Sequence, residues 1–281
     1  MSEGGWSSVR YTAADAEESL ELVRKTWGDI EPTDRAYHQW QCERSPGGPA
    51  IATLARDGEG RLVGQEVTIP IRVTLNAREY PASLSLNTAT DPEWRGRGIF
   101  GRLLRDVCEI SAKEGIAFTY GFPNQSSYPI FLRTEFKDIG SVPLLIKPLN
   151  PRRLVQKATG NRLLATAAWP ANLVWHQPAA RPNRPGQAEI VPVERFDDSF
   201  TAFWQRVKSR YPVMVVRDAA YLNWRFVNVP LRQYACFAAR AGDAVTGFIA
   251  LRVAPVARFR AGLIVDLLVE DGEGGIDAGR R

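Results

Sequence analysis

The stretch from residue 88 to residue 104 constrains the fold of this chain more than any other. An extended run leads there through a basic, glycine-rich loop into an amphipathic helix. Three arginines and three glycines stand in the loop and the first helical turn: Arg95, Gly96, Arg97, Gly98, Gly101 and Arg102. Glycine lacks Cβ, so it can adopt positive φ and admit an anion close to backbone N–H groups. The helix dipole and the arginines favour the same anion, so we interpret the loop as a pyrophosphate cradle.

Other phosphate-binding loops share this glycine spacing. A dinucleotide-binding loop has an acidic residue roughly 20 residues further on, whereas the next extended run here, 117–122, leads into Pro-Asn-Gln. A kinase-type loop has Val two residues after its last glycine, where this chain has Leu103. The structural alternative, a turn before an ordinary helix, does not explain why glycines, arginines and a strand-to-helix transition coincide.

The run 95–104 resembles the acyl-CoA-binding motif of the GNAT family of N-acetyltransferases, in which an arginine or glutamine leads a glycine-spaced loop. Two registers fit, one led by Arg95 and the other by Arg97. Thr90-Asp-Pro92 resembles the tripeptide that closes the family's fourth strand. The likeness covers about residues 8–148. It implies an α/β fold, with a mixed, mostly antiparallel sheet flanked by helices, and acetyl-CoA as cosubstrate.

The resemblance also implies where the cofactor lies. The last residues of the strand before the loop line the pantetheine, the loop and first helical turn hold the pyrophosphate, and an Asn after the fifth strand contacts the cofactor. The expected cofactor-binding residues are Thr88, Ala89, Thr90, Arg95, Gly96, Arg97, Gly98, Ile99, Phe100, Gly101, Arg102 and Asn124.

The reaction also needs a general base and a general acid, because the attacking amine loses a proton and the departing thiolate gains one. The family's tyrosine acid would fall at Phe131, which is not a phenol. Tyr128, one helical turn earlier, is the predicted acid, with stacking or capping as its alternative role. Glu66 is the predicted base and Asp91 a second candidate, although a strand Glu and an Asp before proline are also common structural features.

Composition narrows the function. The chain has 281 residues with a net charge of +5, and its basic residues are spread thinly rather than concentrated in the stripe that nucleic acid requires. Its three cysteines lie far apart and it has only two histidines. A disulfide framework, a metal site and a histidine-centred hydrolase are therefore disfavoured.

No targeting or membrane segment is expected. The N-terminus lacks a basic-then-apolar signal segment, and no run reaches the ~18 apolar residues of a membrane span. We therefore predict a cytoplasmic protein without membrane or nucleic-acid partners. The sequence does not specify an oligomeric state.

Periodicity predicts the elements of the first domain, residues 1–150. Helices are expected at 13–27 and 34–43, from 99, and after Ser127, and strands at 8–12, 51–56, 62–75, 81–90, 117–122, 136–139 and 142–146. The strands at 81–90 and 117–122 flank one helix, so they should run parallel. The strands at 136–139 and 142–146 should close the domain.

The rest of the chain reads as a linker and a second domain. Residues 151–187 are proline-rich and basic, with a helical segment at 163–175. Residues 188–281 repeat the order of helices followed by a strand hairpin, so we expect a partial, GNAT-like domain without a cofactor loop, ending in a disordered tail.

The resemblance thus implies an N-acetyltransferase that moves an acetyl group from acetyl-CoA to an amine. The alternative is a degenerate acyl-CoA-binding or sensing module, which the phenylalanine at 131 favours. The acceptor could be an amino sugar, a small metabolite amine or a peptide amine.

Overall fold

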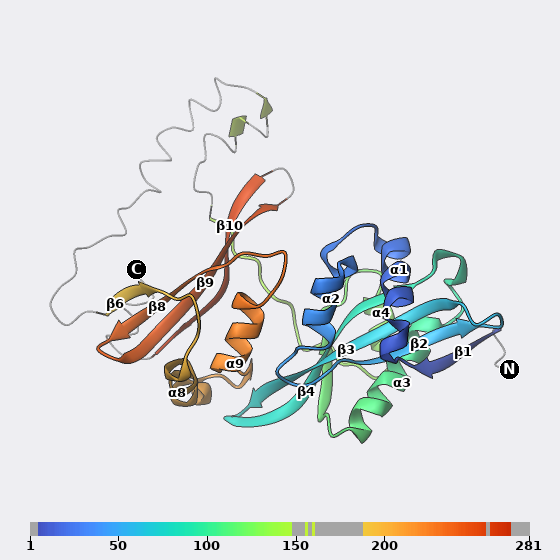
Figure 1. Ribbon diagram of the computed structural model, residues 1–281, viewed down its shortest axis with the longest axis horizontal. Coiled ribbons are helices and arrows are strands. Elements are labelled where there is room, and N and C mark those ends of the chain that lie inside the picture. The colour runs from blue at the N-terminus through green and yellow to red at the C-terminus, as the bar shows by residue number, and fades with distance from the viewer. Residues whose placement is uncertain (1–4, 148–154, 157–158, 161–187, 257–258, 271–281) are drawn as a thin grey trace.

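The computed structural model describes residues 5–147, 155–156, 159–160, 188–256 and 259–270. These residues build two sheets, which lie side by side in Figure 1. The first sheet has the order β1-β2-β3-β4-β5, with β7 added to β3. Its strands are β1 (Trp6–Arg10), β2 (Ile51–Asp57), β3 (Leu62–Leu75), β4 (Arg78–Thr90), β5 (Phe118–Gly121) and β7 (Val213–Val215).

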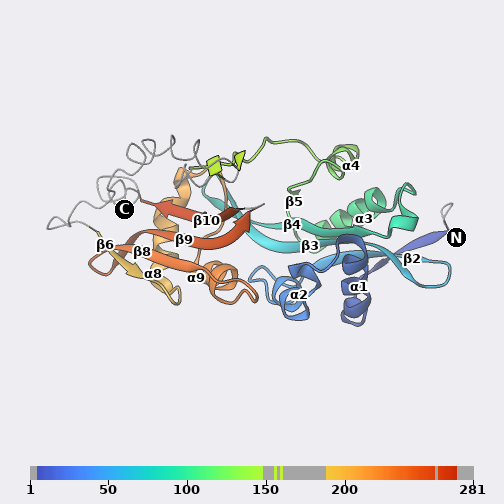
Figure 2. The same ribbon diagram turned by 90° about the horizontal axis from the view of Figure 1, so that it is seen from above.

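Two pairs of helices cover the two faces of this sheet (Figure 2). On one face lie α1 (Ala16–Trp27) and α2 (Arg35–Cys42), and on the other α3 (Ile99–Lys113) and α4 (Tyr128–Arg133). The apolar stripe of α3 explains its position, because Leu103, Leu104 and Val107 are fully buried. The first part of the chain also has 3-10 turns at η1 (Ala13–Asp15), η2 (Glu31–Thr33) and η3 (Pro92–Trp94).

The pairing of β4 positions the candidate site. β4 and β5 run parallel, as the crossover through α3 predicts, and their pairing ends at Ser85 and Gly121. Beyond that point β4 continues to Thr90 without β5. On its other side β4 carries a bulge opposite β3, where Asn87 has a φ of +52°. A bulge bends the strand and re-aims its side chains.

The second sheet has the order β10-β9-β8-β6. Its elements are β6 (Glu189–Pro192), α8 (Asp198–Val207), η4 (Lys208–Arg210), α9 (Ala219–Leu222), a π-helical turn η5 (Asn223–Val227), β8 (Ala235–Ala241), β9 (Ala244–Val256) and β10 (Phe259–Val269). A separate apolar core, which includes Phe200, Phe203 and Trp204, lies between α8 and the sheet. The antiparallel order matches that of β4-β3-β2-β1, with helices again following the first strand.

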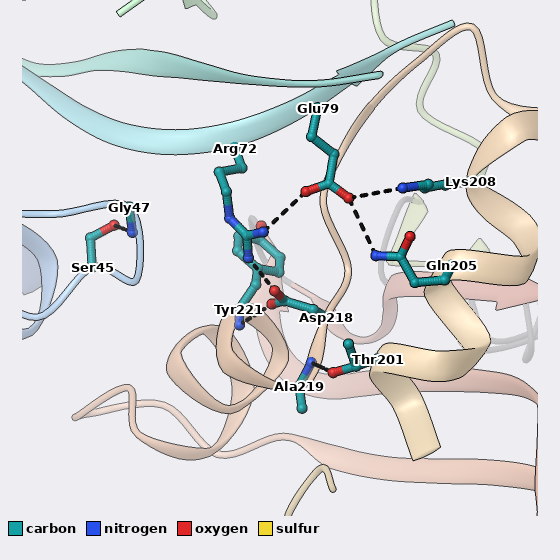
Figure 3. Close-up of polar contacts among 10 residues, drawn as sticks. All are labelled: Ser45, Gly47, Arg72, Glu79, Thr201, Gln205, Lys208, Asp218, Ala219 and Tyr221. Atoms are coloured by element: carbon teal, nitrogen blue, oxygen red, sulfur yellow. Dashed lines mark hydrogen bonds and ion pairs between the residues drawn. The ribbon is translucent and has the colours of Figure 1, made fainter. Parts of the chain in front are cut away.

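The two halves are joined by a strand and a polar network. β7 follows α8 in sequence but pairs with the end of β3, with Val215 opposite Val73. The Arg72 guanidinium lies between the carboxylates of Glu79 and Asp218, and it donates to Glu79 at 3.0 Å (Figure 3). Lys208 donates to the other oxygen of Glu79 at 3.3 Å. The second half therefore packs on the hairpin of β3 and β4.

One predicted pair of strands is wrong. The expected strands at 136–139 and 142–146 have no regular secondary structure, and β7 was not predicted at all. Ile139, Leu144 and Leu145 are 80–91% exposed. A β-prone segment becomes a strand only when it pairs, and a cavity separates residues 136–142 from the edge of β5. The expected linker (151–187) lies almost entirely outside the described residues, and the end of the expected tail (271–281) lies wholly outside them.

Candidate functional site

The loop before α3 has the backbone geometry of an anion cradle. Gly96 and Gly98 have φ of +78° and +71°, a region that only glycine adopts without strain. Gly98 is the N-cap of α3, so the first N–H groups of that helix follow it directly. The loop is exposed from residue 95 to residue 98. An anion can therefore reach both the backbone donors and the positive end of the helix dipole.

Gly101 differs from the other two glycines. It lies inside α3 without a positive φ, so its backbone does not use the conformational freedom that glycine offers. A Cβ placed on Gly101 would meet Ile130 of α4 and Thr134, the C-cap of that helix, at 3.7 Å, an ordinary contact. The residue lies where α3 approaches α4, and the glycine spacing of the motif did not reveal this.

The side chains that follow the loop have different surroundings. Ile99 and Phe100 are buried, so only their backbone groups can face a ligand. Arg95 and Arg97 are exposed, and the Arg97 guanidinium lies 4.3 Å from the centre of the Trp94 ring. Arg102 donates to Asp106 at 2.7 Å, which offsets part of its charge. Arg95 and Arg97 are the better placed cations of the three.

The bulge of β4 is held by a buried carboxyl group. Glu66 on β3 is 0% exposed, and its two oxygens accept from the hydroxyls of Ser85 and Thr88. Burial raises the pKa of Glu66 to about 7, although the two hydroxyl hydrogen bonds oppose this rise. Thr88 is only half-buried. The structure thus brings Glu66 and Thr88 together and places Thr88 between the carboxyl group and the surface.

Asp91, the second candidate base, is held by hydrogen bonds that indicate a structural role. It accepts from the N–H of Glu93 at 3.1 Å and from Lys25 at 2.7 Å. Its pKa is lowered because these hydrogen bonds outweigh the effect of its burial. A carboxylate held in this way caps η3 and is a poor proton acceptor near neutral pH.

Tyr128 and Asn124 lie at the start of α4. Tyr128 is 40% exposed and donates to Asp138 at 2.7 Å, and this hydrogen bond raises the pKa of the phenol. The Asn124 side-chain oxygen accepts from the N–H groups of Ser126 and Ser127, both at 3.0 Å. Phe131 is buried beside Gly121, and its ring has no hydroxyl that could supply a proton. No hydrogen bond links Tyr128 to Glu66 in the described structure.

Sequence reasoning missed three side chains around the bulge. The indole N–H of Trp27, at the end of α1, donates to the Thr88 carbonyl at 3.2 Å, and this ring is 52% exposed. Gln41 of α2 accepts from the Asn87 side-chain amide at 2.6 Å. An Asn in a strand tolerates positive φ better than most residues, so Asn87 was a signal for a bulge. The helical spacing put Trp27 on an apolar face and Gln41 on the second helix, but it did not indicate that either contacts a bulge in β4.

Comparison with known proteins agrees with this geometry. A family model described as an acetyltransferase (GNAT) domain matches residues 9–137. No curated protein matches the sequence. Among the described residues, no helix is long and apolar enough to cross a membrane.

Several solved structures share the fold. A probable N-acyltransferase from Enterococcus faecalis has 14% identity and a TM-score of 0.66, over 98% of this chain and 61% of that chain. A GCN5-related N-acetyltransferase from Anabaena variabilis has 11% identity and a TM-score of 0.67 over the same shares. An N-myristoyltransferase from Saccharomyces cerevisiae with bound myristoyl-CoA has 12% identity and a TM-score of 0.54, over 92% of this chain and 64% of that chain.

At these identities the likeness concerns the fold alone, and this chain spans about 61% of the length of the first two structures. The family match and the loop geometry concern the same segment, because α3 and its glycine loop lie within residues 9–137. Residues 9–137 therefore form a domain of the GNAT acetyltransferase family.

Proposed function

We propose that the protein transfers an acyl group from an acyl-CoA to an amine. One observation carries this proposal: β4 leaves β5 after Ser85, forms a bulge, and then leads into a glycine-arginine loop at the N-terminus of α3. This arrangement would offer backbone donors to a thioester at the end of β4 and to a pyrophosphate at the loop that follows it. Acetyl-CoA is the donor that the family resemblance implies.

The cofactor would bind at two places. The pyrophosphate would lie at Gly96 and Gly98, where positive φ and the first turn of α3 direct N–H groups outward. The pantetheine would follow residues 88–90 at the end of β4. Asn124, whose side-chain oxygen holds its own turn, would contact the cofactor through its amide group.

The reaction needs no covalent enzyme intermediate. The amine nitrogen attacks the thioester carbonyl, the C–N bond forms, and the C–S bond breaks with its electron pair leaving on sulfur. Backbone N–H groups at the bulge would stabilise the oxyanion of the tetrahedral intermediate. The balance requires one proton to leave nitrogen and one to reach sulfur.

Glu66 and Tyr128 would manage these protons. Because Glu66 is fully buried and Thr88 donates to it, the amine proton would pass to the Thr88 oxygen as the Thr88 proton passes to Glu66. A base with a pKa of about 7 suits transfer near neutral pH. Tyr128 would protonate the thiolate, and its raised pKa keeps the phenol protonated until that step.

A degenerate acyl-CoA-binding module is the second candidate. It is favoured by the phenylalanine at position 131, where the resemblance implies a tyrosine, and by the hydrogen bond that already engages Tyr128 with Asp138. Such a module would keep the loop and bind the thioester without transferring its acyl group.

One assay separates the two candidates. The full chain is incubated with acetyl-CoA and a panel of amino sugars, small amines and peptide amines, and free thiol is measured. Amine-dependent thiol release that is lost in Thr88→Val but kept in Thr88→Ser supports transfer through the proposed relay. Tight acetyl-CoA binding without thiol release for any amine would identify the binding module instead.

A further inference from the structure

A large cavity lies along β5, the strand that pairs with β4 as far as Ser85. It has a volume of about 1110 Å³ and runs along β5, with all four residues of that strand in its lining. β5 is the last strand of its sheet, so the cavity lies at the edge that β4 does not occupy. The C-terminal half of α3, α4 and residues 134–142 form its other walls.

One end of the cavity meets the point where β4 and β5 separate. Gly121, Phe122 and Pro123 line this end, and Gly121 is the last residue of β5 that pairs with β4. Tyr128, the proposed proton donor to the thiolate, also lines the cavity. A thioester carbonyl held at the bulge would therefore have its acyl group near the mouth of this cavity.

The lining is mostly apolar and extends far from that mouth. Its apolar side chains include Leu75, Ile116, Phe118, Phe131, Phe136 and Val213. The cavity is as large as sites that hold drug-sized ligands, about 300–1,000 Å³. An acetyl group would leave most of this apolar surface in contact with water, whereas an alkyl chain would cover it.

The length of β5 sets the length of the alkyl chain that the cavity can hold. From Phe118 to Phe122, the residue that follows β5, the extended chain advances about 13 Å, at roughly 3.3 Å per residue. An extended alkyl chain with C–C bonds of about 1.5 Å advances roughly 1.25 Å per carbon, so roughly ten carbons span this length.

We propose that the cavity receives the acyl chain of the donor, which makes a medium-chain fatty acyl-CoA the preferred cosubstrate. This inference rests on the proposed function, because it places the thioester at the β4 bulge. The competing occupant is the protein's own segment 139–146, whose exposed apolar residues could pair with the free edge of β5 and fill the same space.

Calorimetry with acetyl-, hexanoyl-, decanoyl- and myristoyl-CoA tests the inference on the full chain. Affinity should rise about twofold to fourfold per added methylene, fourfold being the value for complete burial. The rise should continue to decanoyl-CoA and then level off. Ala112→Phe, on the cavity wall at the C-terminal end of α3, should move this plateau to a shorter chain without changing acetyl-CoA affinity. The matched control is Lys113→Phe. Lys113 is exposed, as Ala112 is, but it lies outside the lining, so this variant should show the same dependence of affinity on chain length as wild type.

The possible results discriminate between the claims. If acetyl- and decanoyl-CoA bind within twofold of each other, the cavity does not hold the chain and the inference fails, while the proposed function stands. Pairing of residues 139–146 with β5 would give this result. A plateau that stays at decanoyl-CoA in Ala112→Phe would also overturn the inference. Failure of every thioester to bind would instead overturn the proposed function itself.

Discussion

At the scale of single residues, the site depends on a carboxyl group that the sequence placed only roughly. The alternation of β3 put Glu66 on a mixed face, but it could not indicate complete burial or the partners Ser85 and Thr88. Those partners lie across a bulge whose position depends on the pairing of β3 with β4. A side chain's environment follows from such tertiary pairing, which the local sequence does not encode.

Glu66 should make stability depend on pH in an unusual direction. Its pKa is about 7 in the folded protein, above the ordinary 4.5, so the folded state keeps a proton that the unfolded state loses. The contribution of Glu66 to the free energy of unfolding is therefore fully present below about pH 4.5. It is lost as pH rises through about 7, and the loss is on the order of 3 kcal/mol.

Urea unfolding of wild type and Glu66→Gln between pH 4.5 and 8 measures this contribution. The difference between the two proteins cancels the opposite trend of carboxylates with lowered pKa, such as Asp15 and Asp57. The variant should also lose turnover, because an amide cannot accept the proton. Parallel pH curves for the two proteins would contradict a pKa near 7.

Tyr128→Phe tests the acid. Removing a general acid typically lowers kcat by about a hundredfold to ten-thousandfold, and acyl-CoA affinity should change little because the ring remains. Asp138→Ala is the matched control, since it removes the acceptor of the Tyr128 hydroxyl and leaves the phenol in place. Near-normal turnover in Tyr128→Phe would show that water or another group protonates the thiolate.

At the scale of elements, periodicity and the loop motif predicted most of the first domain. The strand at 62–75 matches β3, and the helices and the parallel crossover were confirmed. The motif succeeds because glycine conformation and helix capping are local. The strands at 136–139 and 142–146 failed because strand formation needs a partner, which propensity does not supply. β7 was missed because only three residues form it and its partner is far away in sequence.

A pair of substitutions tests the two kinds of glycine around α3. Gly101→Ala should stabilise the protein by about 0.5–1 kcal/mol, because alanine is favoured over glycine in a helix and its Cβ has room. Gly98→Ala should destabilise it by about 1 kcal/mol, because φ is +71° there. Thermal unfolding measures both. If Gly101→Ala destabilises the protein, α3 and α4 pack too closely for the added methyl group, and the 3.7 Å contact is too generous.

At the scale of the whole molecule, the two halves share a strand, ion pairs and a reciprocal tryptophan contact. The Trp40 indole donates to the Trp224 carbonyl at 2.7 Å, and the Trp224 indole donates to the Trp40 carbonyl at 3.0 Å. Their rings stack with centroids 4.7 Å apart. The predicted domain boundary at residue 150 implies that the first domain folds alone, whereas a fragment of residues 1–150 would lack both β7 and Trp224.

Trp40→Phe should therefore destabilise both halves together. It leaves the buried Trp224 carbonyl without its donor, at a cost of about 1–3 kcal/mol. Urea unfolding followed by circular dichroism and by tryptophan fluorescence should give one coincident transition at lower denaturant. Two transitions, with only one of them shifted, would show that the halves unfold independently.

The central claim is that the loop before α3 binds the pyrophosphate of an acyl-CoA. Calorimetry of CoA binding by the full chain tests it with Gly98→Asp and the matched control Gly60→Asp. Both glycines have positive φ and open surroundings, so the two substitutions carry similar backbone strain. Only Gly98→Asp places a carboxylate at the N-terminus of α3. We predict that it weakens CoA binding by more than about tenfold, which corresponds to 1.4 kcal/mol, while Gly60→Asp binds like wild type. Equal CoA affinity in the two folded variants would contradict the claim.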